Sequence, residues 1–343
     1  MNLVSGPGEF LFSLGKNSGW LGLFLAVAAG ASAAPLEDLP ALSLFPQVDL
    51  AKLKGGHIMV ERGPVGDFPR GISLESCYFI QVSMKDVGDA FLHWNPLDHQ
   101  DSDVRLYREF LPPPAADVFH SLKLNRALAE DRWLLDETTR VGKGGEPGDL
   151  HLTKEEAGIV RQHATDPSKA WSEILRRRSE AAASGGLPAV APYGTDRSIS
   201  PGSEFRRLLK MAPKAAKHFQ PITQTKPFTP GGKPPSETIG YWNAEKVNKH
   251  TSLQLGLFAA QKSADSWQLV DCLYYPSDTY FMSLNLFQLW PVDGGTLVWQ
   301  VSFVSAPFRT YLGGIDRYVA GKLMTEETID TIKAFRAALE KRR

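Results

Sequence analysis

Cysteine is scarce in this sequence: among 343 residues, only Cys77 and Cys272 occur. The absence of a C-x-x-C pair argues against a thioredoxin-type redox centre and against a Cys-rich zinc site. Both cysteines lie in runs typical of β-strands, SCYFIQV and VDCLYY. A disulfide between two strands and two buried free thiols are therefore both open interpretations.

An excess of charge of either sign is also missing, because 38 Lys and Arg residues balance 38 Asp and Glu residues. Without a net field to attract nucleic acid, we expect no nucleic-acid partner. With 43% hydrophobic and 22% charged residues, the composition is typical of a globular domain rather than of a disordered or polytopic membrane protein.

Local catalytic and cofactor motifs are absent as well. The sequence has no G-x-S-x-G, no H-E-x-x-H and no glycine-rich phosphate loop. Any catalytic site would have to be assembled from residues far apart in the chain. The acidic run NPLDHQDSD at residues 95–103 lacks the glycine and the closing Glu of a calcium loop, so we interpret it as a solvated loop. We expect no metal and no cofactor.

Long hydrophobic runs are limited to one, WLGLFLAVAAGASA at residues 20–33, which follows Lys16 and ends in Ala31-Ser32-Ala33. This pattern is typical of a secretory signal peptide that is cleaved before Ala34. The alternative is a membrane anchor, but a spanning helix needs about 20 apolar residues. We therefore expect a signal peptide at residues 1–33, export to the periplasm or the extracellular space, and no stable membrane span after the leader is removed.

Residues 34–110 carry alternating strand and helix signals. A short helical turn at 49–54 and a strand at 58–62 precede a β-rich run at 72–82. Ser83 can cap a helix that begins at Met84, and VRLYREF at 104–110 is a further strand that three prolines end. We interpret these residues as the first part of an α+β core.

Residues 111–236 are different in character and predict a helical insertion and a linker. Thr153 and Glu156 form a capping-box pattern, and Asp166-Pro167 and Ser200-Pro201 each open a helix. The segment 221–235, rich in Pro, Thr, Lys and Gly, has no periodicity and is typical of a linker or an exposed loop.

Residues 237–343 predict an antiparallel meander followed by one long helix. Five β-rich runs follow one another with short breaks, and VDGG at 292–295 is a hairpin turn. FMSLNLFQLW at 281–290 alternates so that one face is strongly apolar, and that face needs cover. The apolar stripe of a helix at 325–341, capped by Thr325, could supply it.

This order of elements resembles the START-like, or SRPBCC, helix-grip superfamily over about residues 56–110 and 238–343. The resemblance implies an α+β fold in which a curved antiparallel sheet grips the C-terminal helix, here interrupted by a mainly helical insertion. It also implies a cavity between sheet and helix that commonly holds sterols, lipids or other apolar molecules. The insertion is the departure from the family, and it could cover or block that cavity.

Three functions follow as hypotheses. The first is an exported protein that binds an apolar small molecule or lipid between the sheet and the C-terminal helix, with no enzymatic activity. Tyr280, Asn285 and Trp299 are its candidate ligand-binding residues, because each offers a polar tip among apolar neighbours. The second is an exported hydrolase or cyclase-type enzyme with a dispersed site in the same cavity. The third is an interaction protein without a cavity, which would use residues 112–233 as its partner surface.

Overall fold

The computed structural model describes residues 34–341, except for residues 65, 100–101, 195–197 and 309–314. The expected signal peptide therefore lies outside the described residues. In the described ranges, every helix is either too short or too polar to form a membrane span.

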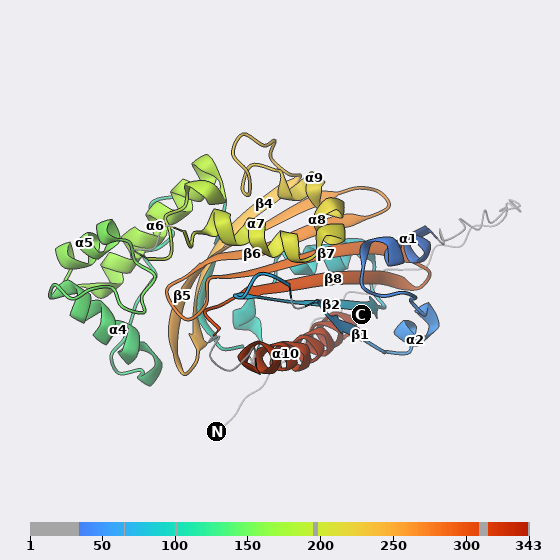
Figure 1. The fold of residues 1–343 in the computed structure, drawn as a ribbon, viewed down its shortest axis with the longest axis horizontal. Helices are drawn as coiled ribbons and strands as arrows, with labels where there is room; N and C mark the ends of the chain where they lie inside the picture. Colours follow the sequence, from blue (N-terminus) through green and yellow to red (C-terminus); the bar gives the residue numbers. More distant parts are fainter. Residues whose placement is uncertain (1–33, 65, 100–101, 195–197, 309–314, 342–343) are drawn as a thin grey trace, which may run out of the picture. The chain divides into compact units, whose positions relative to one another are not determined.

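The centre of the fold is a curved, open sheet of eight strands (Figure 1). All neighbouring strands are antiparallel, and their order is β1-β2-β8-β7-β6-β5-β4-β3. The predicted α+β class is thereby confirmed. The strands are β1 (Met59–Arg62), β2 (Gly71–Ile80), β3 (Val104–Phe110), β4 (Glu237–Val247), β5 (His250–Lys262), β6 (Trp267–Pro276), β7 (Met282–Val292) and β8 (Gly295–Ser305).

Tight turns join the strands of the meander and fix their register. The VDGG turn forms as predicted: Val292 pairs with Gly295, and Gly294 adopts a positive φ of 83°. Between β4 and β5, Val247 pairs with His250 across Asn248 and Lys249, whose φ angles are 48° and 74°. Two successive positive φ angles give the twist that suits a hairpin.

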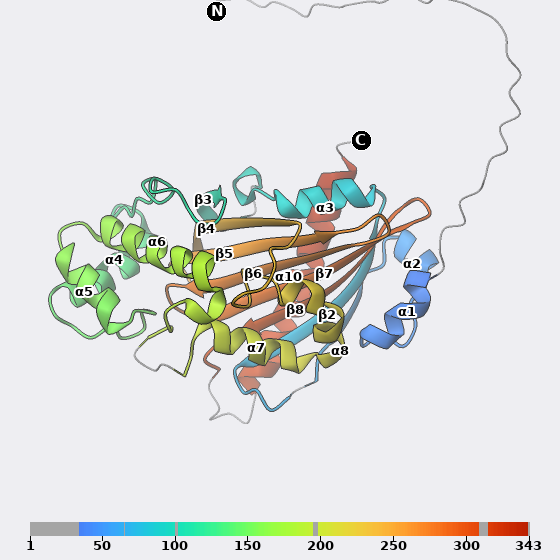
Figure 2. The ribbon, with the colours of Figure 1, turned by 90° about the horizontal axis from the view of Figure 1, so that it is seen from above.

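One face of the sheet is covered by α3 (Met84–Leu92) and α10 (Ile315–Glu340), and we call it the α10 face (Figures 1 and 2). Ser83 accepts a hydrogen bond from the Asp86 N–H, so the predicted cap of α3 is confirmed. Gly88 of α3 lies so close to Trp267 that a Cβ there would stand 2.1 Å from the indole ring. The apolar cluster on this face includes Ile80, Val87, Leu269, Phe287, Leu289, Val298, Ile332, Phe335 and Leu339.

The C-terminal helix begins ten residues earlier than the sequence predicts. Thr325 is therefore not the N-cap; its hydroxyl donates to the Gly321 carbonyl inside the helix. A threonine hydroxyl can accept from a backbone N–H at a cap or donate to the carbonyl four residues earlier within a helix, so its identity alone does not fix the boundary. Near its two ends, α10 is tied to the sheet region by Arg317, which donates to the Gly71 carbonyl, and by Glu340, which accepts from the Gln81 N–H.

The first two helices of the chain and the last three helices before β4 cover the opposite face of the sheet. They are α1 (Ala34–Leu42), α2 (Leu50–Lys54), α7 (Pro201–Met211), α8 (Pro213–His218) and α9 (Gln220–Thr223). Met282, Leu284 and Leu286 of β7 belong to the core on this side. The expectation that the C-terminal helix covers the apolar face of β7 was therefore wrong. Both faces are covered, and alternation along one strand does not tell which helix covers which face.

The remaining helices of the insertion lie near one end of the sheet (Figure 2). They are α4 (Ala129–Gly142), α5 (Lys154–Gln162) and α6 (Pro167–Gly185), followed by the short η2 (Leu187–Ala189), while η1 (Pro96–Asp98) precedes β3. The capping box of Thr153 and Glu156 and the helix starts at Pro167 and Pro201 are confirmed. Within 221–235, Phe228 is buried and stacks on Phe205, which anchors this segment to the helices.

Candidate functional site

A row of side chains runs across the middle of the α10 face. In the register of the sheet, Phe258 of β5 faces Asp271 of β6, Asp271 faces Asn285 of β7, and Asn285 faces Ser302 of β8. Asp271 and Asn285 are only half-buried although they lie on central strands. Central side chains under a covering helix are normally buried, so their exposure indicates a hollow between the sheet and α10.

This hollow is a cavity of about 340 Å³, at the small end of the range of ligand pockets. The sheet forms its floor, α3 and the residues that follow contribute Phe91 and Trp94, and α10 forms its roof. The residues that line it are Tyr78, Phe91, Trp94, Phe258, Asp271, Asn285, Phe287, Gln300, Ser302, Met324, Glu327, Thr328, Thr331, Ile332 and Phe335. The walls are thus largely aromatic, and the floor is polar.

The aromatic wall is built by three elements that meet at Phe91. Its ring lies 4.5 Å from the ring of Phe287 on β7 and 4.4 Å from that of Phe335 on α10, centroid to centroid. Trp94 approaches Phe335 at 5.1 Å. These separations are those of favourable aromatic pairs, which hold the rings in a fixed arrangement.

Asp271 is the carboxyl group in the floor. Its Oδ1 accepts a hydrogen bond from the Tyr241 hydroxyl at 2.8 Å, and its Oδ2 accepts one from Asn285 Nδ2 at 3.2 Å. Burial raises the pKa of Asp271 from 3.8 to about 6, against these two hydrogen bonds, which lower it. Since desolvation disfavours the ionised form, the carboxylate would gain from a positively charged or hydrogen-bond-donating partner.

Searches of protein-family models, curated proteins and solved structures found no match.

The three predicted ligand-binding residues lie in different places. Asn285 lines the cavity. Tyr280 is half-buried and does not line it; burial, together with the charges of Glu245, Asp278 and Asp271, raises its pKa. Trp299 lies on the opposite face, where its indole donates to Glu75 and packs on Phe219, so its assignment to this cavity was wrong. Odd and even positions of β8 point to opposite faces, and the sequence does not say which face holds a cavity.

Asp271, the most informative residue of the floor, was missed by the sequence analysis. The signal was present: a single acidic residue interrupts the apolar run WQLVDCLYY. An acid among apolar neighbours of a central strand indicates either a buried polar network or a ligand site.

The two cysteines are free thiols in the structure, and both are buried. Cys77 lies on β2 and Cys272 on β6, with β8 and β7 between them. Three strand spacings of about 4.8 Å exceed the roughly 7 Å limit between the Cα atoms of a disulfide. The structure therefore matches the interpretation of two free thiols and not that of a disulfide.

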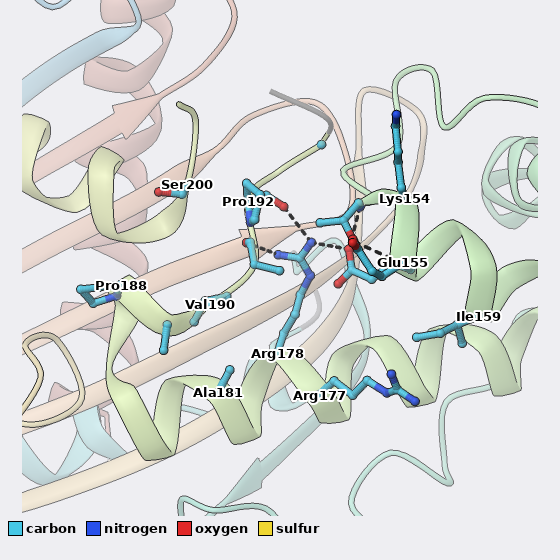
Figure 3. A pocket seen from close by; sticks show the side chains of 15 residues that line it. Lys154, Glu155, Ile159, Arg177, Arg178, Ala181, Pro188, Val190, Pro192 and Ser200 are labelled. Carbon is cyan, nitrogen blue, oxygen red and sulfur yellow. Dashed lines mark hydrogen bonds and ion pairs between the residues drawn. The ribbon is translucent and has the colours of Figure 1, made fainter. Parts of the chain in front are cut away.

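A larger hollow of about 720 Å³ lies among the insertion helices (Figure 3). Its central group, Arg178, is almost fully buried and already has partners: Glu156 at 2.7 Å and the carbonyl groups of Ala191, Pro192 and His151. In Figure 3, dashed lines join this guanidinium to its partners, and others join Thr153 and Glu156. Arg178 thus ties α5 and α6 to the segment after η2, and we assign it a structural role.

A His–Asp pair on the sheet offers a test of the hydrolase hypothesis. His250 Nε2 lies 2.5 Å from Asp278 Oδ2, and the Ser277 hydroxyl donates to Asp278 Oδ1 at 2.8 Å. The carboxylate therefore stands between the serine and the histidine, whereas a catalytic triad requires the histidine in the middle. This arrangement does not activate Ser277 as a nucleophile. Within the described ranges, no three His, Cys, Asp or Glu side chains gather closely enough to hold a metal ion.

Proposed function

We propose that this protein, exported by means of the leader at residues 1–33, binds a small and largely apolar molecule in the cavity between the sheet and α10. The observation that carries the proposal is the partial exposure of Asp271 and Asn285 in the middle of a covered sheet, at the floor of an aromatic-walled cavity. A cavity with apolar walls and a few polar groups is the usual form of a small-molecule site.

The order of elements supports the proposal. Strand β2, helix α3 and strand β3 precede the meander β4–β8, and α10 closes the chain. This is the order on which the resemblance to the helix-grip superfamily rests. The insertion supports it too, because α7, α8 and α9 lie on the other side of the sheet from α10 and leave the cavity free (Figure 1).

The enzyme alternative receives less support. A dispersed catalytic site in this cavity would need a second titratable group in hydrogen-bond reach of Asp271 to share acid and base roles. Asp271 bonds to the Asn285 amide, which does not titrate, and to the Tyr241 phenol, whose pKa burial raises well above its usual value, so that it stays protonated near neutral pH. The interaction-protein alternative assumed that no cavity exists between sheet and helix, which the cavity at Asp271 argues against.

The first experiment is native mass spectrometry of protein purified from the exported fraction, before and after denaturing extraction. We expect a chain that begins at Ala34 and carries an apolar adduct that extraction removes. A full-length chain in the exported fraction would contradict the leader. A clean mass, together with no saturable binding of any apolar fluorescent probe, would contradict the binding function.

A matched pair of variants on α10 tests the position of the site. Thr331 lines the cavity, and Lys333, two residues further on, is exposed and does not line it. T331W should fill the mouth of the cavity and weaken probe binding by about tenfold or more, since overlap with bulky side chains excludes a ligand. K333W should leave it unchanged. Equal effects of the two variants would place the binding site elsewhere.

A further inference from the structure

We infer that the molecule bound in this cavity is an organic cation: an ammonium group, carried on a small aromatic or aliphatic body, that pairs with Asp271. The inference rests on the proposed binding function and adds the chemical class of the ligand. Three features of the cavity support it: the charge of the lining, the free capacity of the carboxylate and the nature of the walls.

The lining is acidic. Asp271 in the floor and Glu327 in the roof are its ionisable carboxyl groups, and none of the fifteen lining residues is Lys, Arg or His. A cation outside the lining, Arg336 of α10, acts on one lining residue: burial raises the pKa of Tyr78, and the charge of Arg336 lowers it. The Arg336 guanidinium donates to the Gly56 carbonyl, which is not part of the lining. In a partly desolvated cavity, this distribution attracts a positive charge and disfavours an anion.

Asp271 has room for another donor. A carboxylate offers about four lone-pair sites, and the hydrogen bonds from Tyr241 and Asn285 use two of them. Because Asn285 and Tyr241 approach different oxygens, they hold the carboxylate in one orientation. The ligand then meets a carboxylate in a fixed orientation. Its two hydrogen-bond donors are neutral, so its negative charge is not balanced by them.

The walls suit a cation as well as an apolar body. Phe91, Phe287 and Phe335 form a continuous aromatic surface, and Phe258 stands next to Asp271 on the neighbouring strand. Aromatic ring faces carry negative electrostatic potential, so rings around a carboxylate form a common kind of site for organic ammonium groups. A neutral apolar ligand would use the walls but would leave Asp271 desolvated without a new partner.

The test uses three probes of nearly equal shape and different charge at neutral pH: 1-naphthylmethylamine, 1-naphthalenemethanol and 1-naphthoic acid. Binding to the full exported chain is measured by calorimetry or by the fluorescence of the naphthalene ring. We expect the amine to bind about tenfold or more tightly than the alcohol, as a charge-assisted pair is stronger than a neutral one. The acid should bind most weakly.

The outcomes separate the inference from the proposed function. If the amine and the alcohol bind equally, or if the acid binds best, the cation inference is wrong and the binding function stands. If none of the three binds saturably, both are rejected. These comparisons use the wild-type chain and do not depend on any variant.

Variants then assign the effect to one residue. D271N keeps the shape of the side chain and should weaken the amine about tenfold while changing the alcohol less than about twofold. Glu326, the exposed neighbour of Glu327 outside the lining, is the control, and E326Q should leave the ratio of the two affinities unchanged. An amine preference that survives in folded D271N would show that Asp271 is not its partner.

Discussion

At the scale of single residues, Asp271 combines two properties that rarely occur together: it lies on a central strand, and it is ionisable. A carboxyl group in this place lowers stability when it ionises, because its charge is partly removed from water. Ionisable groups with a strongly shifted pKa in a cavity are concentrated at functional sites, which is why Asp271 is central to the proposed binding site.

The pH dependence of stability tests the environment of Asp271. Its pKa is raised from 3.8 to about 6 in the folded protein. The folded state therefore holds the proton more tightly than the unfolded chain, and this contribution to stability is present below pH 4 and is lost as the pH rises through 6. The amide of D271N does not titrate, so this contribution does not change with pH in the variant.

We therefore expect the stability of the wild type, relative to D271N, to fall between pH 4 and pH 6.5 by up to about 3 kcal/mol, since each pKa unit corresponds to about 1.4 kcal/mol. Urea denaturation at several pH values measures the difference. D330N, which changes an exposed carboxylate of α10, is the control and should follow the wild type. A difference that does not vary with pH would mean that Asp271 has an ordinary environment.

At the scale of elements, the sequence predicts most strands and helix starts because their signals are local. Ser83, Thr153, Asp166 and Ser200 each cap the helix that follows them, through bonds to backbone groups at most three residues away. The turn at VDGG likewise fixes the β7–β8 register, and this register alone places Asn285 opposite Ser302.

The site was harder to predict because it depends on contacts between distant elements. Periodicity separates the two faces of a strand, but it does not say which face meets α10. Trp299 was assigned to the cavity and lies on the opposite face, while Asp271 on the correct face was missed. The start of α10 was also misplaced, since a threonine serves either as a cap or, as Thr325 does, within a helix, where its hydroxyl donates to the carbonyl of Gly321.

The β4–β5 hairpin provides a test at the element scale. Lys249 has a φ of 74°, which disfavours a side chain and suits glycine. K249G creates the Asn-Gly sequence that this turn prefers, and it should stabilise the protein by about 0.5–1 kcal/mol in urea denaturation. The control acts in the other direction: G294A, at a φ of 83° where the added Cβ would meet only Phe79 Cζ at 4.0 Å, should destabilise by about 1 kcal/mol. A loss of stability in K249G would show that the Lys249 side chain makes a contact that outweighs its backbone conformation.

At the scale of the whole molecule, the helical insertion is part of the core and not an appendage. Phe205, Leu208, Phe219 and Ile222 from 201–223 lie in one apolar cluster with Met282, Leu284 and Leu286 of β7. Removing this segment would expose the most apolar face of the sheet. We therefore expect the insertion and the sheet to unfold together, as buried apolar contacts between them make the two parts cooperative.

The two free thiols can report this cooperativity. Cys77 and Cys272 have no exposed surface, and burial raises the pKa of Cys77 to about 12 and that of Cys272 well above its usual range. Because the thiolate is the reactive form, neither should react with a disulfide reagent such as Ellman's reagent until its strand unfolds. Single C77A and C272A variants leave one reporter each, on β2 and on β6.

Both reporters should become reactive at the same urea concentration, and the helical signal in circular dichroism should be lost over the same range, as for a two-state transition. The helical signal comes in large part from the insertion, so the comparison links the insertion to both strands. If the helical signal changed well before either thiol reacted, the insertion would be a separately folding unit, and its removal could be tolerated.

If instead Cys77 reacted before Cys272, the β1-β2 edge beneath α10 would open independently of the central strands. Such an opening would give a ligand a route to Asp271, because β2 carries Tyr78 of the lining and the Gly71 carbonyl to which α10 is tied.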